Sequence, residues 1–240
     1  MRKKQESYHC NKCKDKGFVF KVVNGYETAT KCSCRVQEEI KEKANMSGLG
    51  DLIKTKTLKN YIATERFQKE IKEKAMEYLQ EFFKGNRHSF ALLGQSGIGK
   101  THIMSAVSRE MLKRNIQVRY YTADDIIQKL NACRFDEENY NREFNIMANA
   151  SVLYIDELFK SSIQRFYNVE SINANDFREI FKIINYRYNK KKPILLNSEI
   201  HFERFADLDQ AMIGRINEMC NKEFIISVKP DKDKNYRLKG

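Results

Sequence analysis

Short apolar runs alternate with amphipathic segments from about residue 60 onward. Five runs have the length and the β-branched or aromatic content of buried strands: residues 90–93, 118–121, 152–156, 194–197 and 224–228. Apolar residues recur at helical spacing between them, in residues 102–113, 124–130, 174–188 and 209–220. This alternation predicts an α/β fold, with a five-stranded parallel sheet and helices on both faces. Ligands of such sheets bind where the strands end.

The pattern also predicts helices before the first of these strands. Residues 64–83 form a long amphipathic helix, with Gly85 as its C-cap. Residues 35–44 form a short charged helix, and residues 47–50 (Ser-Gly-Leu-Gly) break it as a linker does. We therefore divide the chain into a small N-terminal module, residues 1–50, and a larger domain, residues 51–240.

Four of the six cysteines lie in the N-terminal module as two close pairs, Cys10-x-x-Cys13 and Cys32-x-Cys34. Residues 17–30 predict a β-hairpin with Asn24-Gly25 as its turn, which would bring the pairs together. Four thiolates so arranged predict a tetrahedral zinc site, and the metal would supply much of the module's folding energy. Because the second pair is C-x-C, His9 is the alternative ligand; free surface thiols are the other interpretation.

A phosphate-binding loop follows the first predicted strand of the larger domain. Residues 94–101 have the pattern G-x-x-x-x-G-K-T between a strand and a helix, which is the context this loop requires. Its glycines let backbone N–H groups point at a polyphosphate, and the next helix adds its positive end. Lys100 would reach the β- and γ-phosphates of ATP, and Thr101 would bind Mg²⁺. The residues expected to bind nucleotide are Gly94, Gln95, Ser96, Gly97, Ile98, Gly99, Lys100 and Thr101.

Polar side chains also end two of the other predicted strands. Asp156 would hold Mg²⁺, directly or through water, and Glu157 would orient and polarise the water that attacks the γ-phosphate. Asn197 fits a polar sensor of the γ-phosphate; it can instead be a turn residue, and Ser198 is the alternative sensor.

Arg215 lies in a mostly apolar helical segment, residues 211–219. It can be a surface arginine that covers one side of the helix. It can also be an arginine finger, which reaches the nucleotide of a neighbouring subunit and stabilises the charge of the transition state. The residues alone leave both interpretations open.

Net charge and hydropathy limit the classes of partner that the protein can have. The formal net charge is +12 and the sequence pI is about 9.3, which favours nucleic acid as a partner; a solvated lysine-rich surface is the alternative. No apolar run approaches the roughly 20 residues of a membrane span. The charged residues 1–6 are not followed by the apolar region of a secretory signal. We therefore expect a cytoplasmic protein with no membrane partner.

These motifs together resemble the helicase-loader ATPases of the DnaC/DnaI type, in the AAA+ superfamily. The resemblance covers residues 64–237 and rests on residues 94–102 and 152–160. Three further stretches reinforce it: residues 183–188, 197–199 and 214–219. The cysteine-bearing N-terminus is similar to that of phage and Gram-positive members.

The resemblance implies an AAA+ fold and a weak ATPase, stimulated by assembly, that loads a hexameric replicative helicase onto single-stranded DNA. It implies that residues 1–50 hold the helicase, that Arg215 is the finger, and that subunits assemble through the ATP site. Family members contact single-stranded DNA with an insertion, which here would be residues 122–149. The aromatic and basic residues that such contacts need are Arg134, Phe135, Tyr140, Arg142 and Phe144, although Phe135 and Phe144 can instead be core.

The expected cofactors are ATP, Mg²⁺ and Zn²⁺. Little chain follows residues 224–228, so we expect no helical lid, no lid-borne sensor arginine and slow hydrolysis by a monomer. Two other functions remain open. One is a transposition-type AAA+ regulator that coats duplex DNA, and the other is a module that captures the helicase and whose ATPase is incidental.

Overall fold

One parallel sheet organises the molecule. The computed structural model describes residues 8–23, 25–166 and 169–231. The five predicted strands are confirmed, each within one residue at its ends, and lie side by side in the order β4-β5-β8-β3-β9. They are β3 (Phe90–Gly94), β4 (Val118–Thr122), β5 (Val152–Asp156), β8 (Ile194–Ser198) and β9 (Ile225–Val228). Because β8 alone separates β3 from β5, the phosphate-binding loop and the two carboxylates meet at one edge of the sheet.

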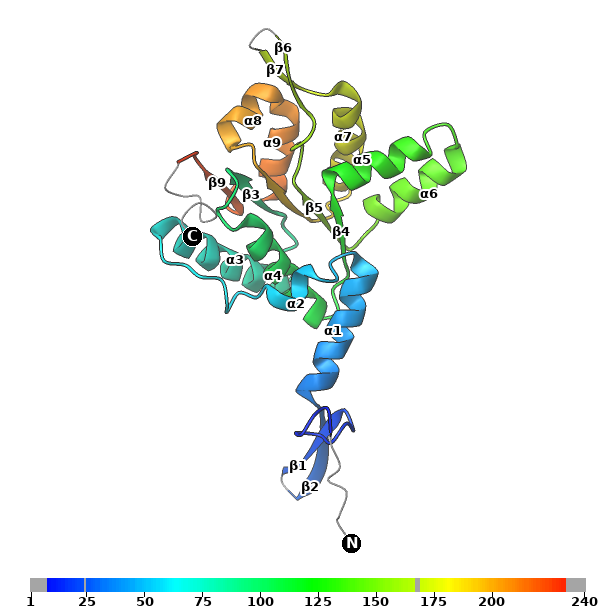
Figure 1. The fold of residues 1–240 in the computed structure, drawn as a ribbon, viewed down its shortest axis with the longest axis vertical. Helices are drawn as coiled ribbons and strands as arrows, with labels where there is room; N and C mark the ends of the chain where they lie inside the picture. Colours follow the sequence, from blue (N-terminus) through cyan, green and yellow to red (C-terminus); the bar gives the residue numbers. More distant parts are fainter. Residues whose placement is uncertain (1–7, 24, 167–168, 232–240) are drawn as a thin grey trace.

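Helices cover both faces of this sheet, as predicted (Figure 1). On one side α4 (Lys100–Lys113) packs against α1 (Ser33–Ser47), α2 (Leu52–Thr55) and α3 (Arg66–Lys84). On the other side α7 (Ala174–Asn189) packs against α5 (Ala123–Ala132), α6 (Glu137–Ala148) and α9 (Gln210–Met219), and α8 (Phe202–Leu208) packs on α9.

The sequence determines where the long helix α3 begins and ends and which of its faces is buried. Its N-cap Glu65 and Gln68 form a capping box, and Gly85 ends it in the left-handed conformation at φ 111°. The apolar stripe is buried, and Tyr78 stacks on Phe90 of β3 with ring centroids 4.9 Å apart. The helix predicted over residues 64–83 is therefore confirmed.

The N-terminal module projects from the body at the far end of α1 (Figure 1). Strands β1 (Phe18–Val23) and β2 (Tyr26–Lys31) pair antiparallel, with Phe18 opposite Lys31, so the predicted hairpin is present. Of the predicted turn, Asn24 lies outside the described residues. The hairpin leads directly into α1, whose N-cap is Cys32.

Residues 47–50 end α1 where the sequence predicted a break, but they pack against the body. Leu49 is fully buried in the core of the larger domain, together with Ile40 and Ala44 of α1. Gly48 adopts φ 81°, and a Cβ there would lie 2.9 Å from the Tyr120 carbonyl oxygen of β4. The second half of α1 therefore packs as part of the body, because its apolar residues continue past the serine and glycines.

The α5–α6 pair fills residues 123–148, where the insertion was expected. Arg187 of α7 fixes the base of this pair. Its side chain is fully buried, and Nη1 donates to the carbonyls of Met147, Ala148 and Ala150 at 2.9 to 3.1 Å. Nη2 donates to the Pro193 carbonyl at 2.6 Å, so one guanidinium joins the end of α6 to the start of β8.

A second hairpin was not predicted. Strands β6 (Ile163–Phe166) and β7 (Val169–Ile172) pair antiparallel after the carboxylate-bearing strand. The ion pair between Arg165 and Glu170 joins the two strands, and Arg204 of α8 reaches Glu170 at 2.7 Å. Among the described residues no helix is both long and apolar enough to cross a membrane.

Candidate functional site

The phosphate-binding loop joins β3 to α4, as its pattern requires. The Lys100 Nζ is largely buried and donates to the carbonyls of Gly94 and Gln95, at 2.6 and 2.8 Å. A Cβ on Gly94 would lie 2.3 Å from the Val228 carbonyl oxygen, and one on Gly99 would lie 2.6 Å from the Tyr61 ring. Both glycines also have a positive φ. Any other residue at these positions would therefore clash with its neighbours and strain the backbone.

A cavity of about 210 Å³ opens at this edge of the sheet. It brings together predicted residues that are far apart in the chain, since Lys100, Thr101, Glu157 and Asn197 all line it. Its other lining residues are Lys56, Ser96, Gly97, Gly99, His102 and Glu199. The loop, the catalytic carboxylate and the sensor amide expected from the sequence therefore share one cavity.

Asp156 lies buried beside that cavity. Its Oδ2 accepts a hydrogen bond from the Tyr120 hydroxyl at 3.2 Å, and its Oδ1 accepts one from the Glu157 N–H at 3.0 Å. Burial raises the pKa of the Asp156 carboxyl above its ordinary value. A divalent cation held by this carboxylate would favour the ionised form, because opposite charges attract strongly where water is excluded.

Asn197 positions the backbone of Glu157. Its Oδ1 accepts from the Glu157 N–H at 2.9 Å, and its Nδ2 donates to the Tyr154 hydroxyl at 3.1 Å. Glu157 has φ 55°, so the chain turns sharply as β5 ends. Ser198, the alternative sensor, donates instead to the Leu158 carbonyl at 2.8 Å inside the core. Of the two, Asn197 is the residue that faces the cavity.

Residues 56–62 lie against the phosphate-binding loop, a contact that was not predicted from the sequence. The Tyr61 hydroxyl donates to the Ile98 carbonyl at 3.2 Å, and the His102 ring meets the Tyr61 ring edge-on at 5.3 Å. An adjoining cavity of about 220 Å³ is lined by Tyr61, Ile62, Ile98 and His102, among others. Its aromatic and apolar walls suit a flat base next to the phosphates.

Arg215 does not line either of these cavities. Its Nε donates to Asn185 Oδ1 at 3.0 Å, and Nη1 donates to the Ala211 carbonyl at 2.9 Å. Its guanidinium lies 5.0 Å from the centroid of the Phe181 ring and 5.8 Å from that of Tyr188. Arg215 is therefore held half-buried between α7 and α9, away from the ATP site of its own chain.

The four N-terminal cysteines form a compact cluster. Their sulfurs lie within 4.8 Å of one another, with 3.8 Å from Cys10 to Cys32 and 3.4 Å from Cys13 to Cys34. Bonds of about 2.3 Å to a tetrahedral zinc ion set sulfurs roughly 3.8 Å apart, so the cluster fits this metal. None of the four is in a disulfide. The imidazole of His9, the alternative ligand, is fully exposed and lies 3.7 Å from Asp15.

The aromatic residues proposed for DNA contact differ in their exposure along the α5–α6 pair. Phe135 is 94% exposed, and the Arg134 guanidinium lies 5.1 Å from its ring centroid. Phe144 is half-buried and packs against the Tyr140 and Tyr186 rings, which joins α6 to α7. Arg142 is exposed and lies 3.8 Å from Glu143. The tip therefore presents Arg134 and Phe135 to solvent, while Phe144 contributes to packing.

Comparison with known proteins agrees with this site. Residues 11–239 match the family described as IstB-like ATP binding protein. The chain is 30% identical to the phage-like element PBSX protein XkdC of Bacillus subtilis, over 97% of this chain and 87% of that protein. It is 29% identical to the replicative helicase loader DnaC of Escherichia coli, over 68% of this chain and 63% of DnaC.

Solved structures show the same fold. A crystal structure of the DnaC helicase loader superposes with a TM-score of 0.59 at 20% identity, covering 70% of this chain and 96% of that one. DnaA of Aquifex aeolicus bound to AMPPCP superposes with a TM-score of 0.58 at 24% identity, covering 79% and 54%. From the matched residues 11–239, the chain belongs to the family of IstB-like ATP binding proteins, and it shares the fold of DnaC and DnaA.

Proposed function

We propose that this protein is an ATP-dependent loader, which binds a hexameric replicative helicase and places it on single-stranded DNA during replication initiation. The observation that carries the proposal is the pairing of a complete ATP site with an N-terminal cysteine cluster in one chain that is similar to DnaC. ATP would govern assembly, and its slow hydrolysis to ADP and phosphate would end each loading event.

Within the ATP site each residue has a proposed role. The loop N–H groups and Lys100 bind the phosphates, and Thr101 with Asp156 holds Mg²⁺. Glu157 orients the attacking water, since it lies at the cavity with its backbone fixed by Asn197. Lys160 Nζ lies 2.6 Å from Glu157 Oε1, and this contact helps to fix where the carboxylate lies.

Arg215 completes the site of a neighbouring subunit. It is preorganised by Asn185 and the aromatic rings of α7, yet it lies outside the cavities of its own chain. An arginine so placed can reach a nucleotide only across an interface, which makes hydrolysis depend on assembly. This arrangement supports the expectation that an isolated subunit is a weak ATPase and that subunits assemble through the ATP site.

The two ends of the molecule would contact the two macromolecular partners. The N-terminal module would hold the helicase, and its β1–β2 hairpin projects from the body at the end of α1 (Figure 1). The α5–α6 tip offers an exposed aromatic ring beside a guanidinium, which are the groups that stack on a base and bind a phosphate.

The test is a loading assay with the full chain. Purified helicase, this protein and ATP are mixed with circular single-stranded DNA, and DNA-bound helicase is measured after a salt wash. We expect loading that needs ATP and is lost in Lys100→Ala. Helicase that binds the protein but never reaches DNA would instead favour a helicase-capturing module with incidental ATPase.

The family match also favours a second candidate, a transposition-type regulator that coats duplex DNA. One relative is an insertion-sequence ATP-binding protein of Geobacillus stearothermophilus, 25% identical over 68% of this chain. The two functions differ in their nucleic acid. Tighter ATP-dependent binding to duplex than to single-stranded DNA of equal length, without helicase binding, would replace the loader proposal.

A further inference from the structure

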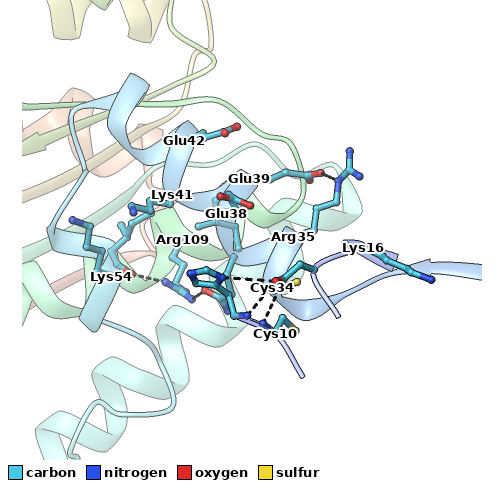
Figure 2. A pocket seen from close by; sticks show the side chains of 16 residues that line it. Cys10, Lys16, Cys34, Arg35, Glu38, Glu39, Lys41, Glu42, Lys54 and Arg109 are labelled. Carbon is cyan, nitrogen blue, oxygen red and sulfur yellow. Dashed lines mark hydrogen bonds and ion pairs between the residues drawn. The ribbon is translucent and has the colours of Figure 1, made fainter. Parts of the chain in front are cut away.

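A groove of about 1030 Å³ lies where the N-terminal module meets the body. We call it the junction groove and define it by the charged residues Lys16, Glu38, Lys41, Glu42, Lys54 and Arg109. Figure 2 shows Lys16 of the module at one end, Lys54 of α2 at the other, and the glutamates of α1 between them. The ATP site takes no part in it, so this groove needs an explanation of its own.

Arg109 of α4 is the unusual residue of the junction groove. Its side chain is 7% exposed, although it is a cation. Nη1 donates to the Ile53 carbonyl at 2.5 Å and Nη2 to Gln37 Oε1 at 2.8 Å, whereas Nε has no acceptor. No carboxylate of the described residues forms an ion pair with it. A buried cation without a counter-ion is costly, so the groove is suited to receive an anionic group from outside.

The walls of the groove carry unpaired charges of both signs. Glu38 and Glu42, one helical turn apart on α1, are exposed and form no ion pair in the described part of the chain, and the same holds for Lys16 and Lys41. Glu39 is occupied, since Lys31 lies 2.8 Å from it. Acidic and basic side chains are interspersed along α1, which does not match the uniform negative charge of a nucleic acid. A protein segment that itself carries both signs would find a partner for each charge.

We propose that the junction groove binds a segment of the helicase that carries acidic and basic side chains, with an acidic group on Arg109 and a basic group on Glu38 and Glu42. The identity of the partner rests on the proposed function. The groove is large enough for a turn of helix or a short extended peptide, and a carboxylate would supply the negative charge that the Arg109 guanidinium lacks.

The position of Arg109 connects the junction groove to the nucleotide site. Arg109 lies on the helix that begins with Lys100 and Thr101, and it bonds to the carbonyl of Ile53 in α2. The chain that follows α2 reaches the phosphate-binding loop, where Tyr61 bonds to Ile98. A ligand on Arg109 therefore touches both elements that shape the nucleotide site. Linkage then requires that ATP and the segment change each other's affinity by the same factor.

The test compares two single charge reversals in the full-length protein. Glu42→Lys alters the groove, and Glu73→Lys alters an equally exposed glutamate on α3 that lies outside it. The affinity for the purified hexameric helicase is measured with ATP, at two salt concentrations. We expect Glu42→Lys to weaken binding about tenfold or more and Glu73→Lys to leave it within about twofold. Arg109→Lys should also weaken binding, since lysine keeps the positive charge but lacks the planar set of N–H donors of a guanidinium. Thermal melting checks that this variant is folded.

A photocrosslinking residue at position 42 identifies what occupies the groove. A crosslink to a helicase segment with both acidic and basic residues supports the proposal. A crosslink to residues 1–7 of the same chain, or to DNA, overturns it. If the wild type binds helicase and Glu42→Lys binds equally well, the groove proposal alone fails. If the wild type binds no helicase at all, the proposed function fails, and the groove proposal fails with it.

Discussion

The proposed role of Arg215 across an interface can be tested by mixing two inactive variants. Arg215→Ala retains Lys100 and the rest of its own ATP site, because Arg215 lines neither nucleotide cavity. Lys100→Ala loses its own phosphate contacts but still presents Arg215, which is held by Asn185 on the opposite group of helices. Each variant therefore lacks a different half of an interface site.

The expected recovery follows from random pairing. In an equimolar mixture about one interface in four joins an intact Lys100 to an intact Arg215, as long as both variants assemble equally well. Removal of a finger costs on the order of 10³-fold or more in rate, so either variant alone should be nearly inactive. The mixture should then regain up to about a quarter of the wild-type rate per subunit, far above either variant.

Phosphate release measured against protein concentration, with and without helicase and single-stranded DNA, provides the assay. The wild-type rate per subunit should rise with concentration, since the site is completed only on assembly. Arg66→Ala is the control and should behave as wild type, because Arg66 is an exposed residue of α3 that pairs with Glu70. A mixture that gives only the average of two inactive proteins, together with a wild-type rate independent of concentration, would refute an interface role for Arg215.

Three further predictions follow from the site and the module. Glu157→Gln should retain ATP affinity and lose turnover, whereas Lys100→Ala should weaken ATP binding itself; fluorescent-nucleotide titration separates them, and an equal loss of affinity in both would mean that Glu157 is wrongly assigned. Cys13→Ser should lose about one equivalent of zinc and make the module sensitive to protease. A wild-type module that stays folded after complete metal removal would contradict this prediction. Phe135→Ala should weaken single-stranded DNA binding by about 1 to 3 kcal/mol, whereas Phe144→Ala should lower the melting temperature; the reverse pattern would show that Phe135 is the packing residue.

Most of the sheet and the ATP motifs could be predicted, because both depend on local patterns. The apolar runs at residues 90–93 and 152–156 need only their own neighbours to be recognised as strands, and the loop pattern at 94–101 specifies its context. Parallel strands then gather their ends at one edge. This is why Lys100, Glu157 and Asn197 line one cavity although almost a hundred residues separate the first from the last.

Contacts between distant segments could not be predicted in the same way. Tyr61 meets Ile98 and Gly99 only because the chain after α2 crosses the phosphate-binding loop, and nothing in residues 56–62 specifies that path. The burial of the candidate linker, residues 47–50, could not be predicted for a related reason. Serine and glycine indicate where a helix ends, but they do not reveal that Leu49 between them is buried against the body. The β6–β7 hairpin was missed because its strands are only four residues each and largely exposed.

Arg187 gives the α5–α6 pair the mechanics of a rigid arm. One buried guanidinium clamps the end of α6 to the start of β8, and the Tyr186 hydroxyl adds a bond to Asn149 at 3.0 Å. Bending at the base would break several hydrogen bonds at once, so the arm should swing only when the whole sheet tilts. A fluorophore at position 135 would accordingly report a tilt of the sheet when ATP binds, because the tip moves with the body.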